Sequence, residues 1–316
     1  MNDDEAGSRG RDVRDIVAAR LPGYAIRSVT LLGEGEDNVA YQVTGVGGEL
    51  IVRFAKDPDP EARAARVEGE ARLLAAVADL APLPVPEPCF ADAERGCLAY
   101  RKLPGLPLTG VPLSRWPKHA ETVGAAAGEL LAALHGAAAE HLVPLVEVDH
   151  QPPRVWLEEA AQMYATVAAR VPAARRPAIE AFLEAPPPPG PEALAFSHND
   201  LGVEHVLLDP ATGTVTGVID WSDAAICDPA YDFGLLYRDL GPAALDRALS
   251  RYPGDGRREA IAARAAFYAR CSLLEDLAYG LDPGQDVYLS KSLAALERLY
   301  PDAVARGAQG SRDLGM

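Results

Sequence analysis

The sequence predicts an α+β protein with two lobes, a small strand-rich lobe followed by a larger, mainly helical one. Residues 28–57 hold three short β-rich runs separated by glycine turns, whereas apolar residues at helical spacing dominate the chain beyond them. With 316 residues, the chain is long enough for each lobe to bury its own core. We expect the first lobe over residues 1–99, a hinge over 100–104 and the second lobe over 105–316.

The first lobe is expected to contain two helices beside its strands. After a polar start that we expect to be disordered, apolar residues recur at helical spacing up to the sequence LPG; they are Val13, Ile16, Val17 and Leu21. The strand-rich region follows, with turns at Gly33–Gly35 and Gly45–Gly48. Helical spacing returns over residues 59–80, with an apolar face formed by Val67, Leu73, Leu74 and Val77. The proline-rich residues 82–90 should interrupt the structure before a last strand within 96–103.

The second lobe is predicted to consist of helices interrupted by one hairpin. Apolar spacing marks a long helix around Val123–Leu134 and another over residues 154–171. The proline run within 185–193 must be a loop, because proline donates no backbone hydrogen bond. Strand-like runs at 205–209 and 213–220 flank a short turn and are predicted to pair, after which helices resume to the end of the chain.

Composition and charge narrow the classes of function. The chain has 46 acidic and 30 basic residues and a formal net charge of −16, so its long-range field repels nucleic acid and anionic lipid. The four cysteines form no CxxC pair and no zinc-like cluster with histidine. The start of the chain lacks a basic segment followed by an apolar one, and no apolar run approaches the length of a membrane span. We therefore expect a cytoplasmic protein with no nucleic-acid or membrane partner.

The most informative stretch is HNDLGVEH, which begins at His198 and precedes a strand. Zinc is the weaker interpretation, because the spacing gives neither a helical pair of ligands nor a partner cluster. A hairpin would return GVIDW, and with it Asp220, to the loop that contains Asp200 and His205. Such a set suits phosphoryl transfer, in which Asp200 orients an attacking hydroxyl while His205 and Asp220 hold magnesium. His198 is expected to brace the loop backbone.

These motifs resemble those of a known family. FSHNDLGVEHVLLD at 196–209, followed by GVIDWSDAAICDPAYDFGLLYRDLG at 217–241, is similar to the pattern of the aminoglycoside and macrolide O-phosphotransferases, which are relatives of the protein kinases. The usual form is HGDxxxxN, then a hairpin, then I-D-F/W. Here His205 replaces the asparagine, a departure associated with the aminoglycoside 2''-phosphotransferases and the macrolide 2'-phosphotransferases. The resemblance implies a two-lobed kinase-like fold, a catalytic role for Asp200 and a metal site that accepts Mg²⁺ or Mn²⁺.

A glycine loop in the first lobe is a candidate for covering the nucleotide. Gly33 and Gly35 lie in LLGEGEDNVAYQV, where the missing side chains let backbone N–H groups approach phosphates. An ordinary hairpin turn would carry the same glycines. We expect the acidic side chains of this loop, Glu34, Glu36 and Asp37, to point outward, away from the triphosphate.

The resemblance also assigns a cation and its partner. Arg53 falls where the family keeps a lysine or arginine on the third strand, with Lys56 as the close rival. Glu70 matches the helix glutamate that pairs with this cation in kinases and fixes it over the α- and β-phosphates.

The hinge CLAYRKLPG is expected to present backbone groups to the purine, chiefly at Ala99, Tyr100 and Lys102. The side chain of Tyr100 would either stack on the base or pack in the lobe. The co-substrate is ATP or GTP, since members of the family differ in this choice.

The acceptor pocket is expected on a helix of the second lobe. Glu275 and Asp276 lie in YARCSLLEDLAYG, which resembles the helix that lines the aminoglycoside pocket of the 2'' enzymes; a solvated helix face is the alternative. Asp232 is expected to brace the metal loop, and His135 is expected to be structural.

The leading hypothesis is an antibiotic kinase that transfers the γ-phosphate of ATP or GTP to a hydroxyl of an aminoglycoside-type antibiotic, which would confer resistance. Its partners would be a nucleoside triphosphate and a small-molecule antibiotic. The alternatives are a macrolide 2'-phosphotransferase, which would need an apolar acceptor cleft, and a metabolic kinase of the choline or fructosamine type. A binding protein that merely kept the fold has no reason to retain every part needed for phosphoryl transfer.

Overall fold

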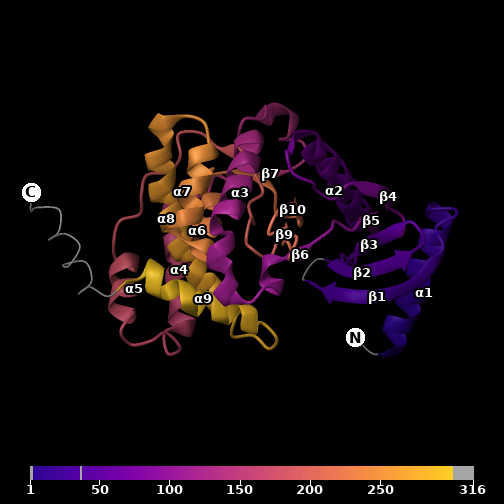
Figure 1. The fold of residues 1–316 in the computed structure, drawn as a ribbon, viewed down its shortest axis with the longest axis horizontal. Coiled ribbons are helices and arrows are strands. Elements are labelled where there is room, and N and C mark those ends of the chain that lie inside the picture. Colours follow the sequence, from indigo (N-terminus) through magenta and orange to yellow (C-terminus); the bar gives the residue numbers. More distant parts are fainter. Residues whose placement is uncertain (1–2, 36–37, 302–316) are drawn as a thin grey trace, which may run out of the picture. The chain divides into compact units, whose positions relative to one another are not determined.

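The computed structural model describes residues 3–35 and 38–301 (Figure 1). The chain divides into two compact units: Met1–Pro104 with Gly217–Ser222, and Gly105–Thr216 with Asp223–Met316. The first is built on a sheet and the second mainly from helices, so the predicted α+β class is confirmed. No helix in the described ranges is both long and apolar enough to cross a membrane.

The first unit is a five-stranded antiparallel sheet with two helices. The strand order is β1-β2-β3-β5-β4. The elements are α1 (Asp3–Arg20), β1 (Ile26–Glu34), β2 (Asn38–Gly45), β3 (Gly48–Ala55), α2 (Pro60–Leu80), β4 (Pro88–Asp92) and β5 (Cys97–Arg101). Helix α1 begins at Asp3, in the segment for which we expected disorder, and β4 begins within the proline-rich segment that was expected to interrupt the structure. A proline can open a strand when its position needs no donor.

Alternating residues build the core of this unit. Val39, Tyr41 and Val43 point to the same face of β2, where they pack against Val13 and Val17 of α1. The predicted face of α2 is confirmed; its buried residues are Val67, Leu73, Leu74 and Val77.

Glycine is required in the turn between β2 and β3. Gly47 and Gly48 have φ values of 110° and 111°, which side-chain-bearing residues rarely adopt. The turn sets the register that places Arg53 opposite Ala40 on β2 and Leu98 on β5.

The second unit contains most of the helices. Its longer elements are α3 (Ala120–His135), α4 (Pro153–Val167), α5 (Arg176–Leu183), α6 (Ala230–Leu240), α7 (Pro242–Arg251), α8 (Asp255–Tyr279) and α9 (Asp286–Leu299). Its short strands are β6 (Leu106–Pro107), β7 (Glu147–Val148), β8 (Ala195–Ser197), β9 (Val206–Leu208), β11 (Ala225–Cys227) and the first half of β10 (Val215–Val218), whose last two residues belong to the first unit. The 3₁₀ turns span Leu108–Gly110, Leu113–His119 and Ala139–His141. The predicted pair of strands around the turn at 209–214 is β9 and β10, which are neighbours in a three-stranded sheet with β6.

A second small sheet, in the order β7-β11-β8, frames the main motif. Ala225 pairs with Ser197, and Cys227 pairs with Ala195. The segment that precedes His198 and the segment that follows Asp223 are therefore held side by side. These strands have two or three residues each, too few for an alternating pattern to show in the sequence.

His135 should make the protein sensitive to acid. Its ring lies 3.0 Å from the Tyr252 hydroxyl at Nδ1 and 3.2 Å from the Ser197 hydroxyl at Nε2, as expected for a structural residue. Burial lowers the pKa of His135 from 6.5 to about 3. Between these pH values, the imidazole of His135 stays neutral in the folded protein but takes up a proton in the unfolded chain. We expect stability to fall as pH drops from about 6.5 towards 3, by up to about 1.4 kcal/mol per pH unit. Urea unfolding of the wild type and of His135→Asn across this range should show a flatter dependence in the variant; identical slopes would contradict the assignment.

Candidate active site

The predicted site residues are distributed over both units. Those in the first unit are Gly33, Gly35, Arg53, Glu70, Ala99, Tyr100, Lys102 and Asp220. Those in the second unit are Asp200, His205, Glu275 and Asp276.

A buried carboxylate, that of Asp232, holds the loop between β8 and β9 in place. Asp232, at the start of α6, accepts the backbone N–H groups of Asn199 and Leu201, each at 3.2 Å. Burial raises the pKa of Asp232 to about 6, and the N–H donors oppose that rise. Asp232 was expected to brace the metal loop, but its hydrogen bonds brace the loop that carries Asp200.

Two further residues shape the loop around Asp200. His198 is fully buried, and its Nδ1 accepts the backbone N–H of Asp200 at 3.3 Å, which confirms its bracing role. Asn199 has a φ of 63°, a left-handed conformation that asparagine tolerates better than most residues. Its side chain donates to the Asp223 carbonyl at 3.1 Å and lies 3.4 Å from the Cys227 thiol.

The environment of Asp200 favours proton transfer near neutral pH. Burial raises the pKa of Asp200 to about 7, with added repulsion from Glu204 and Asp223 and an opposing effect of His205. The side chain is still 40% exposed, which moderates these effects and leaves the carboxylate open to a ligand. A carboxylate of this kind can orient a hydroxyl group and take its proton.

His205 has the tautomer that a metal ligand needs. Its Nδ1 lies 2.7 Å from the backbone carbonyl oxygen of Asp200 and 3.3 Å from the carboxylate of the same residue. Because a carbonyl oxygen only accepts, Nδ1 must carry the proton, and in the neutral ring Nε2 carries the lone pair. Histidine ligands of metals are commonly held by such a hydrogen bond from the second nitrogen.

The first unit brings together the predicted cation and two carboxylates. Arg53 Nη1 lies 2.9 Å from Glu70 Oε1 and 3.5 Å from Asp220 Oδ1. The side chains of Arg53 and Glu70 are only 11% and 12% exposed, whereas that of Asp220 is 41% exposed. Burial raises the pKa of Glu70 and the Arg53 charge opposes it. Lys56, the rival cation, is used differently: it pairs with Glu34 at 2.8 Å and donates to the Gly35 carbonyl.

The space beside Gly33 and Gly35, where a side chain would lie, is open. Among the described residues, a methyl group added at Gly33 would meet nothing within 4 Å, and one added at Gly35 would meet only the Asn38 carbonyl at 3.9 Å. The Gly35 N–H donates to this carbonyl at 2.9 Å and closes the loop. Of the acidic residues expected to point outward, Glu34 pairs with Lys56, while Glu36 and Asp37 lie outside the described residues.

The structure corrects the predicted hinge contacts. The Lys102 backbone N–H donates to the Glu49 carbonyl at 3.0 Å, so it is occupied by the sheet and does not face a purine. Backbone groups alternate along an antiparallel strand, and those of Arg101, the last residue of β5, therefore point to the other side. Tyr100 is 8% exposed and bonds to Arg53, so it packs within the lobe, where burial raises its pKa to about 12. Ala99 lies inside β5, opposite Val52 on β3.

The segment that carries Asp220 packs against the residues that connect α2 to β4. Val218 N–H donates to the Pro84 carbonyl at 3.0 Å. A side chain at Gly217 would collide with this carbonyl and with Leu103, at 2.9 and 2.7 Å. A larger residue at this position would force Pro84 or the Leu103 side chain to move.

The structure does not support Asp276 as a free acceptor-binding carboxylate. Its side chain is 14% exposed and lies 2.9 Å from Lys291 Nζ and 3.2 Å from Arg238 Nη1, so two cations inside the protein balance its charge. Glu275 is exposed on α8 and keeps its predicted role as an expectation. Partial desolvation by the surrounding protein and the negative charge of Asp276 raise its pKa.

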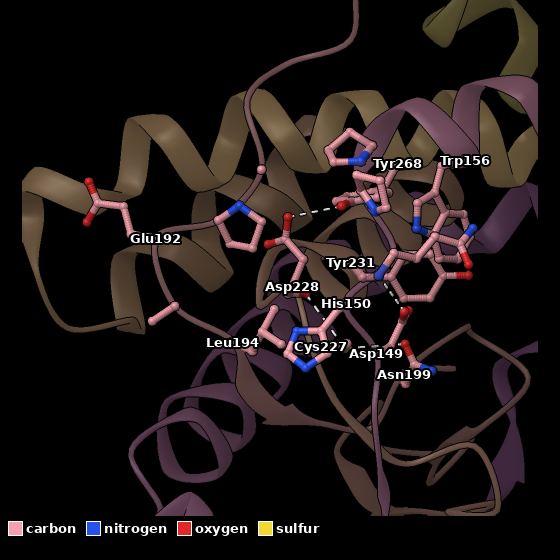
Figure 2. A pocket seen from close by; sticks show the side chains of 16 residues that line it. Asp149, His150, Trp156, Glu192, Leu194, Asn199, Cys227, Asp228, Tyr231 and Tyr268 are labelled. Atoms are coloured by element: carbon pink, nitrogen blue, oxygen red, sulfur yellow. Dashed lines mark hydrogen bonds between the residues drawn. The ribbon is translucent and has the colours of Figure 1, made fainter.

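A pocket of about 390 Å³ in the second unit was not predicted (Figure 2). Its walls come from five separated parts of the chain: residues 149–156, residues 190–194, Asn199, the segment from the end of β11 into α6, and Tyr268 of α8. Trp156 and Tyr231 lie beside each other in its wall, with ring centroids 4.8 Å apart. No motif or period in the sequence links these segments.

The comparisons with known proteins decide the family. A model of the phosphotransferase enzyme family (APH) matches residues 28–267. The chain belongs to this family. Viomycin phosphotransferase of Streptomyces vinaceus is 27% identical over 291 residues, which cover 89% of this chain and 96% of that protein. An aminoglycoside 3'-phosphotransferase of Streptomyces fradiae is 39% identical over 88 residues, which cover 25% of this chain and 32% of that protein.

Solved structures of phosphotransferases share the fold. The GDP complex of aminoglycoside 2'-phosphotransferase-IIIa aligns with a TM-score of 0.69 and 21% identity, covering 92% of this chain and 98% of that one. Macrolide 2'-phosphotransferase MphH from Brachybacterium faecium aligns with a TM-score of 0.57 and 26% identity, covering 90% and 98%. The predicted kinase-like fold and the predicted enzyme class are confirmed.

In a phosphotransferase, Arg53 should act on the nucleotide. We expect Arg53→Met to raise the KM for nucleotide about tenfold or more, since a charge-assisted hydrogen bond to phosphate is worth about 1.5–3 kcal/mol. Lys56→Met is the matched control, with an expected change below about twofold. Initial rates at varied nucleotide concentration measure both variants; a larger effect at Lys56 would reverse the assignment.

Proposed function

We propose that this phosphotransferase is a small-molecule kinase that transfers the γ-phosphate of ATP or GTP to a hydroxyl group of a cationic antibiotic of the aminoglycoside type. The observation that carries the proposal is the loop in which His198 and Asp232 fix the backbone on both sides of Asp200. Support also comes from the relatives, which include a viomycin phosphotransferase and an aminoglycoside phosphotransferase.

In the proposed reaction, Asp200 orients the acceptor hydroxyl and takes its proton. The hydroxyl oxygen forms a bond to the γ-phosphorus while the bond between this phosphorus and the β,γ-bridging oxygen breaks, which releases the nucleoside diphosphate. The transition state of phosphoryl transfer is loose, so the position of Asp200 contributes more than its basicity. Release of the proton from Asp200 to water completes the cycle.

The residues of the first unit would hold the nucleotide. Arg53, fixed by Glu70 at 2.9 Å, would bind the α- and β-phosphates, and Gly33 and Gly35 would let the loop cover them. We expect the purine edge to face the backbone of Arg101. Solved relatives hold GDP or ATP, so both nucleotides are candidates.

The two predicted metal ligands are of types that divalent cations accept. His205 would offer Nε2 and Asp220 a partly exposed carboxylate, and the pairing of an imidazole with an oxygen ligand suits Mn²⁺ as well as Mg²⁺. When bound, such an ion neutralises charge on the phosphate oxygens.

A growth panel tests the substrate class. A susceptible bacterial strain that expresses the protein should tolerate more kanamycin or viomycin than the same strain expressing Asp200→Ala. Protection against macrolides alone would favour the macrolide 2'-phosphotransferase alternative, which the relationship to MphH supports. Protection against none of these drugs would contradict the antibiotic kinase and favour a metabolic small-molecule kinase.

A further inference from the structure

Helix α6 presents two carboxylates to the loop between β8 and β9. Asp232 and Asp239 are separated by about two helical turns, so they lie on the same face of the helix. Asp232 accepts the backbone N–H groups of Asn199 and Leu201. Asp239 accepts the N–H of Val203 at 3.2 Å, so one face of α6 binds alternate backbone donors of the loop.

Val203 lies between the proposed catalytic residue, Asp200, and the proposed metal ligand, His205. Its side chain is buried, and both of its backbone groups are bound by residues outside the loop. The N–H donates to Asp239 of α6, and the carbonyl accepts the N–H of Leu108 at 3.2 Å. The position of Val203 is therefore fixed on two sides.

The other hydrogen bonds of this turn are internal. The Asp200 carbonyl accepts the Gly202 N–H at 2.9 Å and lies 2.7 Å from Nδ1 of His205. The His205 N–H donates to the Gly202 carbonyl at 3.1 Å. These bonds stay within residues 200–205, so they shape the turn without attaching it to the rest of the protein. The bond from Val203 to Asp239 attaches the turn to α6 just before His205.

The Asp239 carboxylate is itself held and stays charged. Its side chain is 2% exposed, and Arg238 donates to both of its oxygens, to Oδ1 at 2.8 Å and to Oδ2 at 3.0 Å. Lys291 Nζ lies 3.4 Å from Oδ1. Burial favours the neutral form, but the charges of Arg238 and Lys291 outweigh burial and lower the pKa of Asp239. An ionised acceptor binds an N–H group more strongly than a neutral acceptor does.

Asp276 offers a comparison within the same cluster of charges. Its carboxylate pairs with the same two cations, Lys291 at 2.9 Å and Arg238 at 3.2 Å. Among the residues that the structure describes, no backbone N–H of the loop donates to Asp276. Removal of either carboxylate changes the charge of the cluster by the same amount, but removal of Asp239 also releases Val203.

We infer that Asp239 is a positioning residue for phosphoryl transfer, which holds His205 in place relative to Asp200 through the backbone of Val203. The inference rests on the proposed function, and it assigns a role to a residue that does not touch the reacting atoms. Residues that orient a metal ligand typically contribute about ten- to a hundredfold to metal affinity or activity. Loss of the Asp239 contact should therefore weaken the binding of a divalent cation and lower kcat, each about tenfold or more.

Metal binding and turnover of Asp239→Ala and Asp276→Ala test the inference. Each variant loses one carboxylate of the cluster, and we expect similar losses of stability in urea unfolding. Electron paramagnetic resonance measures Mn²⁺ binding in the presence of ADP or GDP, without any transfer reaction. Asp239→Ala should weaken Mn²⁺ binding and lower kcat about tenfold or more, whereas Asp276→Ala should change each less than about twofold.

A backbone substitution removes the hydrogen bond and leaves the cluster intact. Replacement of Val203 by its α-hydroxy acid exchanges the N–H that Asp239 accepts for an ester oxygen. The same replacement at Val46, whose N–H donates to the Ala25 carbonyl at 3.0 Å in the first unit, is the matched control. The ester at Val203 should reproduce the effects of Asp239→Ala on Mn²⁺ binding and kcat, and the ester at Val46 should not. If Asp239→Ala does not fold, the two esters decide the inference.

The outcomes separate this inference from the proposed function. If the wild type phosphorylates an antibiotic but the Asp239 and Val203 variants keep its Mn²⁺ affinity and kcat, the inference is wrong and the kinase stands. Equal losses in Asp239→Ala and Asp276→Ala, with no effect of the ester at Val203, would also overturn the inference. If Mn²⁺ binding depends on Asp239 but no antibiotic is phosphorylated, the positioning of His205 stands and the proposed function fails. If the wild type neither binds Mn²⁺ nor transfers phosphate, both are wrong.

Discussion

Asp200→Ala is expected to lower kcat by about three orders of magnitude or more while the KM for nucleotide changes less than about twofold. The substitution removes the only group assigned to orient the hydroxyl and take its proton. It leaves the loop in place, because the hydrogen bonds to His198 and His205 use the main chain of residue 200. The nucleotide contacts assigned to Arg53 and Glu70 belong to the first unit and should persist.

Steady-state kinetics with Asp200→Ala, Asp200→Asn and the exposed control Asp246→Asn measure this effect. The control should retain wild-type kcat. If position matters more than basicity, the asparagine variant should retain part of the activity that the alanine variant loses. Wild-type turnover in the alanine variant would reject the catalytic role.

The second large effect is expected from Lys291→Met, which should lower the free energy of unfolding by about 3–5 kcal/mol. Lys291 is 2% exposed on its side chain and touches three carboxylates: Asp276 at 2.9 Å, Glu204 at 3.2 Å and Asp239 at 3.4 Å. Burial lowers the pKa of this ammonium group, but the carboxylates outweigh burial and raise it, so it stays charged. Without it, Arg238 alone would have to balance three buried negative charges.

The same cluster reaches the loop that carries Asp200 and His205. Asp239 accepts the Val203 N–H at 3.2 Å, and Glu204 directly precedes His205. Urea unfolding measures the loss, with Lys102→Met as the control: that lysine pairs with Glu49 at 3.0 Å near the surface and should contribute less than about 1 kcal/mol. Equal effects of the two substitutions would show that the buried cluster does not stabilise the second unit.

Local patterns predicted the fold where elements were long or regularly spaced. Glycine turns marked the strands of the first unit, and helical spacing identified the buried face of α2 down to Val67 and Val77. Strands β7, β8 and β11, with two or three residues each, were missed because no period shows in so few residues. Helix α5 was missed as well.

The candidate site shows the same limit. The Arg53–Glu70 contact and the bracing by Asp232 follow from motifs whose spacing is fixed along the chain. Asp276 was expected to face a substrate, but it pairs with Arg238 and Lys291. These partners lie on other helices, so the sequence alone does not reveal the ion pairs. The aromatic pocket is likewise assembled from distant segments. The prediction that the Lys102 backbone faces the purine could have been corrected from the sequence. Backbone groups alternate in direction along a strand, and continuing this alternation past Tyr100 turns the Lys102 N–H towards the neighbouring strand.

The most direct test of the account is phosphate transfer by the purified protein. Kanamycin and viomycin are each incubated with Mg²⁺ and ATP or GTP, and mass spectrometry follows both the antibiotic and the nucleotide. The account predicts that one antibiotic gains one phosphate for each nucleoside diphosphate released, and that Asp200→Ala abolishes the transfer. Nucleotide binding without phosphate on any acceptor, or equal transfer by the Asp200→Ala variant, would contradict it.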